Sequence, residues 1–291
     1  MNWLDILAQG ILLGGLYTLF AAGLSLVFGI MRLVNLAHGD FIVAGAFAIL
    51  VLVESFALNL FLAAIIAAPA MFALGWVLQR VVFNRVLGKD ILPPLLVTFG
   101  LSVAIQNGML EIFSADSRRI SGGGVESASI DFGIVTLGWL PLLTFISAVA
   151  AIYALNIIFY RTALGRAFRA TSDDSVTVGL MGINPHGIFA IATGLAMVVV
   201  TIAALFLGMR ANFDPSIGPE RLLYAFEAVI IGGLGSIWGT LAGGILIGVA
   251  QTFGAALNPE WQILAGHLVF LVVLMIRPSG LFPRAGDRGG R

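Results

Sequence analysis

The side chains of this sequence that could carry chemistry interrupt long apolar stretches. Burial of such polar groups costs free energy unless they find partners or line a hydrated cavity. They therefore predict contacts between helices or with a solute that moves through a bundle. Asp40 also stands where a helix would start, so its carboxylate could simply offset the helix dipole. The candidates for a translocation path are Asn35, His38, Asp40, Gln106, Asn107 and Glu227.

The sequence gives no support for an enzyme. The only lysine, Lys89, is followed by Asp90, so the chain has no P-loop that could hold ATP. The chain has no cysteine, and its three histidines, His38, His186 and His267, are far apart, which gives no metal-ligand spacing. The formal net charge is zero, so no basic field attracts nucleic acid. We expect no catalytic residue, no metal, no cofactor and no nucleic-acid partner.

The polar stretch 161–185 predicts two short helices between two apolar runs. Ser172 is expected to cap the second helix, Gly182 to end it, and Pro185 to begin the next apolar helix. Apolar side chains on this loop favour docking in a groove of a partner. The alternative is a solvated basic loop. The apolar set consists of Val176, Val178, Leu180 and Met181.

A glycine series lies within the last long apolar region. Gly235, Gly239 and Gly243 recur at every fourth position, so one helix face would lack side chains and allow close helix contact in lipid. The same glycines weaken a helix and favour a break beside a binding site. Close packing is the simpler role. The residues expected to form the break and the packing face are Gly232, Gly233, Gly235, Gly239 and Gly243.

Long apolar runs must position all these residues. Hydrophobic residues make up 59% of the chain and charged residues 10%, against about 25% charged in soluble proteins. Because about 20 apolar residues cross a bilayer as a helix, we predict an all-α, polytopic transmembrane bundle. It should have about eight spanning helices, within a range of about seven to nine, with one helix broken by glycines. The expected helices are Ile6–Met31, Gly39–Val53, Leu58–Phe83, Ile91–Phe113, Ile134–Tyr160, His186–Met209, Leu222–Ile231, Ile237–Leu257 and Trp261–Ile276.

Basic residues in the short connections predict the orientation. They cluster at 80–89, in the loop 160–185 and in the tail 277–291. By the positive-inside rule these regions are cytoplasmic and the N-terminus is outside. We expect a single transmembrane domain over residues 1–291. Its first apolar run is too long for a cleaved signal and should remain as a helix.

Four groups of residues occur together over nearly the whole chain: 15–29 with 35–40, 165–170 with 179–184, 232–239 with 243–244, and 277–282. Together they resemble the integral-membrane permease subunits of branched-chain amino acid ABC importers, the LivH type. Two positions depart from the pattern. Family members often have Glu in place of Asp40, which keeps the charge. They often have proline in place of Trp238, which leaves the geometry of the break open.

The resemblance implies a heterodimer with a second, similar permease, together with two cytoplasmic ABC ATPases and an extracytoplasmic solute-binding protein. It also implies a multi-pass location in lipid, in the cell inner membrane. The short helix pair of the loop 160–185 would then couple the chain to an ATPase. The residues that match this element are Gly165, Arg166, Phe168, Arg169, Ala170, Gly179, Leu180, Met181, Gly182 and Asn184.

We therefore expect a transport subunit without an ATP site of its own, which moves a small polar or zwitterionic solute by alternating access. Branched-chain or other amino acids are the favoured solutes, and urea, short amides or aromatic acids are the alternative for the same type of importer. An ion-coupled secondary transporter would instead use Asp40 and Glu227 as coupling carboxylates. A passive channel for urea-like solutes is the other competing class.

Overall fold

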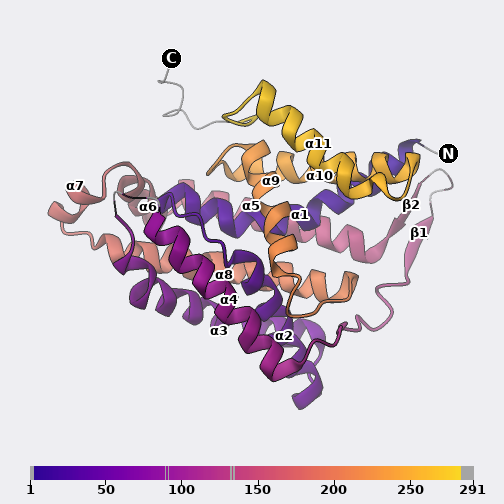
Figure 1. Ribbon diagram of the computed structural model, residues 1–291, viewed down its shortest axis with the longest axis horizontal. Coiled ribbons are helices and arrows are strands. Elements are labelled where there is room, and N and C mark those ends of the chain that lie inside the picture. Colours follow the sequence, from indigo (N-terminus) through magenta and orange to yellow (C-terminus); the bar gives the residue numbers. More distant parts are fainter. Residues whose placement is uncertain (1–2, 89, 91, 132, 134, 283–291) are drawn as a thin grey trace.

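The computed structural model describes residues 3–88, 90, 92–131, 133 and 135–282. The N-terminus and a small hairpin lie at one end of the molecule, called here the hairpin end, and α6 and α7 lie at the opposite end (Figure 1). The elements are α1 (Trp3–Met31), α2 (His38–Phe56), α3 (Leu60–Val81), a 3-10 turn (Phe83–Arg85), α4 (Leu92–Phe113), β1 (Ser129–Asp131), β2 (Thr136–Gly138), α5 (Trp139–Arg161), α6 (Ala163–Asp173), α7 (Ser175–Leu180), α8 (Pro185–Arg210), α9 (Gly218–Gly232), α10 (Ile237–Leu257) and α11 (Trp261–Ile276).

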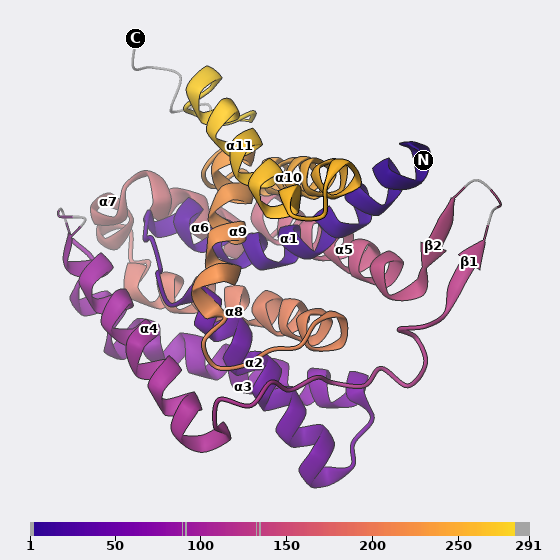
Figure 2. The ribbon, with the colours of Figure 1, turned by 45° about the vertical axis from the view of Figure 1, so that its right-hand side comes forward.

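Seven helices of the described residues are long and apolar enough to cross a membrane: α1, α2, α3 with its 3-10 turn, α4, α5, α8 and α10. The apolar helix α11 is shorter, at 16 residues. Helix α9 crosses the long helices steeply and links the region of α2 to that of α10 (Figure 2). The predicted all-α polytopic bundle, with one helix broken by glycines and a short helix pair, is confirmed.

Helix α1 forms the centre of the bundle. It packs against α5, α8, α9 and α10, and Leu19, Phe20 and Ala21 are fully buried. A helix that is apolar on all sides must be covered on all sides, and α1 satisfies this within the chain from Gly10 onward, whereas Trp3 and Leu4 are exposed. Helix α4 is the opposite case, because Leu92 and Leu96 are about 70% exposed and such surfaces face lipid or another membrane subunit.

Two glycine faces let α10 approach its neighbours closely. A Cβ atom on Gly239 or Gly243 would overlap the backbone of α9, whereas one on Gly244 or Gly248 would overlap the backbone of α1. The chain breaks between α9 and α10, where Gly233 has a φ of 103° and Gly235 one of 75°. Glycine adopts such angles without steric cost, and this explains why the apolar run does not continue as one helix.

The predicted helix Ile134–Tyr160 is wrong at its start. Helix α5 begins only at Trp139, because residues 136–138 pair antiparallel with residues 129–131. The hairpin is attached to α1, since the backbone N–H of Thr136 donates to Asp5 at 3.2 Å and its carbonyl accepts from Gln9 at 2.6 Å. Ile134, Lys89 and most of the predicted tail, residues 283–291, lie outside the described residues.

Candidate functional site

Glu227 on α9 is a buried acidic group among the polar residues around α9, α10 and α11. The residue is 2% exposed. Its Oε1 pairs with Nδ1 of His267 on α11, and its Oε2 has no hydrogen-bond partner. A buried carboxylate oxygen without a partner carries a free-energy cost, so its presence requires an explanation.

Two tyrosines connect Glu227 to neighbouring helices. The rings of Tyr17 on α1 and Tyr224 on α9 lie 4.9 Å apart, and Tyr224 stacks on His267 at 6.3 Å. The Tyr17 hydroxyl donates to Oε1 of Gln251 on α10 at 2.5 Å. These contacts create one group of polar side chains that extends from the bundle interior, at Glu227 and Gln251, to the exposed carboxylate of Glu220. We call it the polar cluster: Tyr17, Arg210, Glu220, Arg221, Tyr224, Glu227, Gln251 and His267.

Arginines form the other part of the polar cluster. Arg210 ends α8, and Arg221 lies in the first turn of α9. Both interact electrostatically with Tyr17. Arg221 pairs with Glu220 at 3.2 Å, and the same carboxylate oxygen accepts from the Tyr224 hydroxyl at 3.2 Å. The polar cluster therefore combines two cations with the buried carboxylate of Glu227.

Asp40 lies where the N-terminal turns of α2 and α9 cross. The residue is fully buried, and within the described part of the chain neither carboxylate oxygen makes a hydrogen bond of good geometry, although Ser102 and Gln106 lie beside it. A Cβ atom on Gly218 would overlap Oδ1 of Asp40, and one on Gly39 would overlap the Gly218 carbonyl. Only glycines allow this approach, so Asp40 is held against the start of α9. Its side chain does not cap α2, whose first turn it occupies.

The other sequence-predicted path residues have local partners. Asn35 accepts from the backbone N–H of Ala37 at 3.0 Å, and Nε2 of His38 lies 2.8 Å from the Phe20 carbonyl. Gln106 lies beside Asp40 and donates to Ser102 at 3.1 Å. Asn107 is exposed on α4 and donates to the Val103 carbonyl. The structure thus places Gln106 with Asp40, Glu227 in the polar cluster, and Asn107 apart from both.

Helix α6 is held firmly against the end of α5. A Cβ atom on Gly165 would overlap the carbonyls of Ile158 and Phe159. Arg169 donates to the Phe159 carbonyl and lies 5.5 Å from the Tyr160 ring. Phe168 is fully buried and stacks on Phe159 at 6.4 Å. Phe168 therefore positions α6 instead of offering a docking surface, whereas Arg166 is exposed.

Helix α7 begins differently from the prediction. Asp174, not Ser172, is the N-cap: it accepts from the backbone N–H groups of Val176 at 3.0 Å and Thr177 at 3.1 Å. These bonds and the Thr177 hydroxyl stabilise the ionised form and lower the pKa of Asp174. Ser172 instead donates to the Gly29 carbonyl on α1 at 2.9 Å. Both residue types cap helices, so sequence alone does not distinguish them.

Helix α7 and the residue after it present apolar side chains to solvent. Val176 is 74% exposed, Leu180 85% and Met181 76%. The fourth residue of the predicted apolar set, Val178, is buried, so the set is smaller than expected. Ala170 lies on α6 and Gly179 on α7. Gly182, with a φ of 84°, lies just after the end of α7. Asn184 caps α8, because its side-chain oxygen accepts from the backbone N–H of Gly187 at 3.3 Å.

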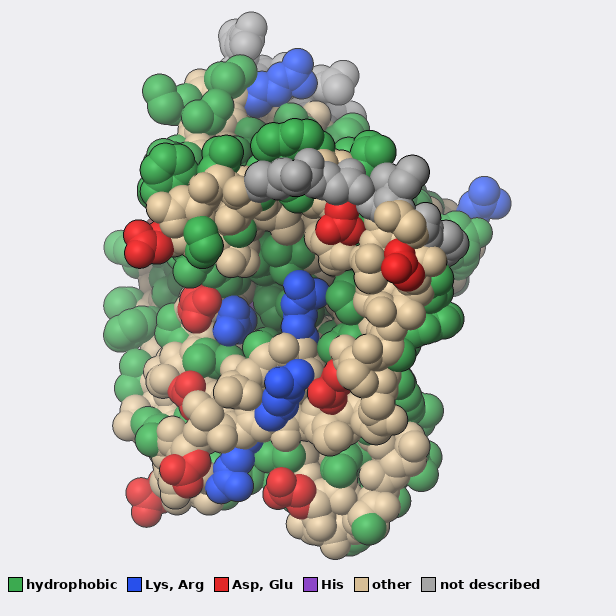
Figure 3. All heavy atoms as spheres, turned by 90° about the vertical axis from the view of Figure 1, so that its right-hand side faces the viewer, with side chains coloured by type: hydrophobic (Ala, Val, Ile, Leu, Met, Phe, Trp, Pro, Cys, Tyr) green, Lys and Arg blue, Asp and Glu red, His purple; other side chains and the backbone are tan. Residues whose placement is uncertain are grey.

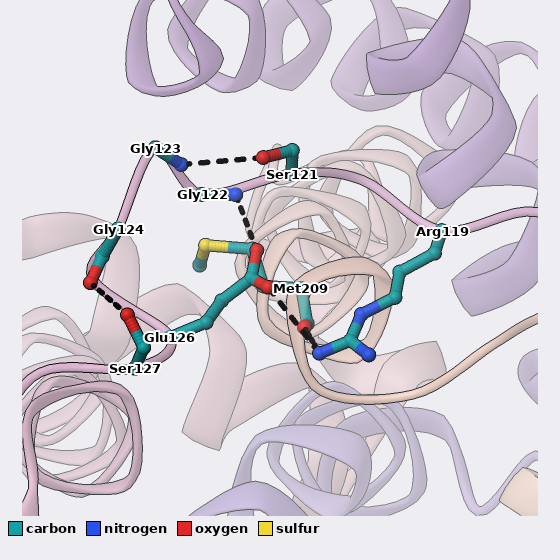
Figure 4. A network of polar contacts seen from close by, with 8 residues as sticks. All are labelled: Arg119, Ser121, Gly122, Gly123, Gly124, Glu126, Ser127 and Met209. Carbon is teal, nitrogen blue, oxygen red and sulfur yellow. Dashed lines mark hydrogen bonds and ion pairs between the residues drawn. The ribbon is translucent and has the colours of Figure 1, made fainter.

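At the hairpin end, the loop after α4 is tied to the end of α8. Arg119 donates to the Met209 carbonyl and pairs with Glu126, both at 3.3 Å, and the backbone N–H of Gly122 donates to the same glutamate (Figure 4). Figure 3 shows basic side chains in a row down this end of the molecule, with acidic side chains on both sides and a recess beside the row.

Several polar-cluster residues were not predicted from the sequence. Tyr17 and Gln251 are polar residues within apolar runs, and they are 234 positions apart. Arg210 and Arg221 flank a short connection and look like ordinary loop arginines. The sequence does place Arg210 and Arg221 on either side of the connection before Glu227, which could have indicated a shared polar site. It does not specify which helices contact one another.

Comparison with known proteins agrees with this architecture. The family described as "Branched-chain amino acid transport system / permease component" matches residues 6–276. The permease protein BraD of Pseudomonas aeruginosa, of a high-affinity branched-chain amino acid transport system, is 30% identical over 97% of this chain and 96% of its own. LivH of Escherichia coli is 27% identical over 98% and 96% of the two chains.

More distant relatives include LivM of Escherichia coli, which is 26% identical over 92% of this chain and 68% of its own length. Among solved structures, PsaBC from Streptococcus pneumoniae in complex with Fab is similar, with a TM-score of 0.50 and 13% identity over 94% of this chain and 92% of that chain. At that identity the similarity concerns the fold alone. By the match over residues 6–276, this chain belongs to the permease family of branched-chain amino acid transport systems.

Proposed function

We propose that this chain is one permease half of an ABC importer that carries branched-chain or other amino acids across the cell inner membrane. The observation that carries the proposal is the apolar surface of α7, formed by Val176, Leu180 and Met181, at the end opposite the hairpin. Exposed apolar patches of this kind bind partners. The α6–α7 end would face the cytoplasm, where an ATPase can reach it, and the hairpin end would face outward.

The attachment of α6 and α7 supports a coupling role. Arg169 ties α6 to the last turn of α5, and Ser172 ties it to α1. A displacement of α7 by an ATPase would therefore move α1 and α5 and not be absorbed by a loose loop. The contact between α7 and the ATPase would differ between the two states of an alternating-access cycle, since ATP can favour one state only if the ATPase binds the two states with different free energies.

The proposed assembly contains a second, similar permease, two cytoplasmic ABC ATPases and an extracytoplasmic solute-binding protein. The binding protein would dock on the segments 114–131 and 210–221, where the side chains of Arg118 and Arg119 are 43% and 50% exposed. Residues 1–291 would form one permease domain, with 160–185 as the cytoplasmic coupling loop and 277–291 as a cytoplasmic tail. The broken helix and its glycines would lie next to the path.

A substitution at the tip of α7 tests the proposal. Burying a leucine in a partner contributes about 1.5–3 kcal/mol, so Leu180→Asp should weaken ATPase binding by about 10- to 100-fold. The matched control is Ser175→Asp, which adds the same charge to an exposed position at the start of α7. Co-purification of the ATPases and ATP-driven uptake of leucine in proteoliposomes should be lost in the first variant and retained in the second.

The same assay separates the alternatives. Uptake that continues without the ATPases and collapses with an ion gradient would indicate a secondary transporter and refute the proposal. Equilibration without ATP would indicate a channel. ATP-driven uptake of urea, an amide or an aromatic acid in place of leucine would keep the importer and change its solute.

A further inference from the structure

We propose that the polar cluster is a binding site inside the permease for the carboxylate and ammonium groups of an α-amino acid in transit. This inference rests on the proposed function, because it identifies where the proposed solute would bind within this chain. The ligand class is a free amino-acid zwitterion.

The first observation is a set of unused hydrogen-bonding groups. Four buried atoms of the polar cluster lack a partner: Nη1 of Arg210, Nε of Arg221, Nε2 of Gln251 and Oε2 of Glu227. Three of these are donors and one is an acceptor. A zwitterion offers the complementary set, because its carboxylate accepts and its ammonium group donates.

The second observation is the separation of charge. The arginines belong to the end of α8 and the first turn of α9. Glu227 lies six residues beyond Arg221 along α9, beside His267 of α11. Tyr224 connects the two groups, since its hydroxyl donates to Glu220, the partner of Arg221, and its ring stacks on His267, the partner of Glu227. The geometry therefore suits a carboxylate near the arginines and an ammonium group near the glutamate.

A buried glutamine elsewhere shows what a purely structural polar contact looks like in this chain. Gln79 is fully buried, donates to Asn84 at 2.9 Å and accepts from Thr193 at 2.7 Å. Both groups of its side chain are used. Gln251 is equally buried, at 1% exposure, but uses only its oxygen. Because unpaired buried donors are costly, the contrast favours a ligand role for Gln251.

The polar cluster is also placed where solute would enter. Arg210 directly follows Met209, whose carbonyl accepts from Arg119 of the loop at the hairpin end. The recess beside the row of basic side chains opens on the same end of the molecule (Figure 3). The Arg221 side chain is 17% exposed and that of Glu227 only 3%, so we expect a solute released there to meet Arg221 before Glu227.

The test uses the complete importer in proteoliposomes, with leucine as the probe and a saturating amount of loaded binding protein. The readout is leucine imported per ATP hydrolysed. Glu227→Gln and Gln251→Leu should each lower this ratio by about tenfold, the effect of losing one well-placed polar contact. Glu227→Asp should restore part of it. The matched control Gln79→Leu removes a buried glutamine away from the polar cluster and should leave the ratio unchanged.

The outcomes separate the site from the proposed function. An unchanged ratio in both Glu227→Gln and Gln251→Leu, or an equal fall in Gln79→Leu, overturns the site and leaves the importer intact. A wild-type complex that hydrolyses ATP without importing leucine overturns the proposed function for that solute and the site with it. ATP hydrolysis that stays unchanged in Glu227→Gln while import falls excludes a merely structural role, which would lower import and hydrolysis together.

Discussion

Replacing Gly239 by alanine should destabilise the fold through the α9–α10 contact. A Cβ atom there would lie 2.8 Å from the carbonyl carbon of Gly232 and from Oγ of Ser236, whereas ordinary contact begins at 3.4 Å. The closest neighbour is backbone, which cannot rotate away, so the helices must separate. Overpacking costs about 1–3 kcal/mol, and the better helix propensity of alanine offsets about 0.5–1 kcal/mol. We expect a net loss of about 0–2.5 kcal/mol.

The matched control is Gly108→Ala in α4. No atom of a neighbouring residue lies within 4 Å of a Cβ at that position, so only the gain in helix propensity remains, about 0.5–1 kcal/mol. The measurement is denaturant-induced unfolding of the full chain in one detergent, with the yield of monodisperse protein as a second readout. Gly239→Leu should be worse in both. Equal stability of Gly239→Ala and Gly108→Ala would refute the reasoning.

Three further predictions concern hydrogen bonds outside the polar cluster. Because the pKa of Asp174 is lowered in the folded state, the stabilisation from its N-cap is present above the ordinary aspartate pKa and is lost as the pH falls through the pKa of the folded state. Hydrogen exchange of the α7 backbone amides should show this loss. Asp174→Asn should keep the cap without pH dependence. The hydroxyls of Thr240 and Ser25 share a hydrogen bond of 2.8 Å between α10 and α1, so Thr240→Val should cost about 0.6 kcal/mol, with no further cost from Ser25→Ala in a double-mutant cycle. Arg119→Ala should release the loop after α4 and speed its proteolysis, whereas an unchanged cleavage rate would show that Glu126 is held without it.

Helix positions were largely predictable because a long apolar segment is stable in a bilayer only as a helix, which satisfies its own backbone hydrogen bonds. Ile237–Leu257 and Trp261–Ile276 match the structure at both ends. The β-hairpin was missed because Thr136–Gly138 continues directly into an apolar run, and only its pairing with residues 129–131 makes it a strand. The hydropathy of an apolar run does not show which residues outside the run will pair with its first residues.

The candidate site was less predictable than the fold. The sequence identified Glu227 as a polar residue that needs a partner, but not His267 as that partner. The polar cluster arises where five helices meet, so its members are set by tertiary packing and not by local spacing. Phe168 belongs to the predicted coupling element, and the structure places it inward against Phe159. The sequence did not show which neighbour covers it.

The glycine faces of α10 have a mechanical consequence for the whole transporter half. Gly244 and Gly248 bring its backbone against that of α1, and α1 also receives the hydrogen bond from Ser172 at the far end of the molecule. Helices in such backbone contact cannot easily move relative to each other, so α1 and α10 should move as one rigid body. A displacement of α7 should therefore also displace Tyr17 and Gln251. If an ATPase binds α7 as proposed, its movement would be transmitted to the hydrogen bond between Tyr17 on α1 and Gln251 on α10.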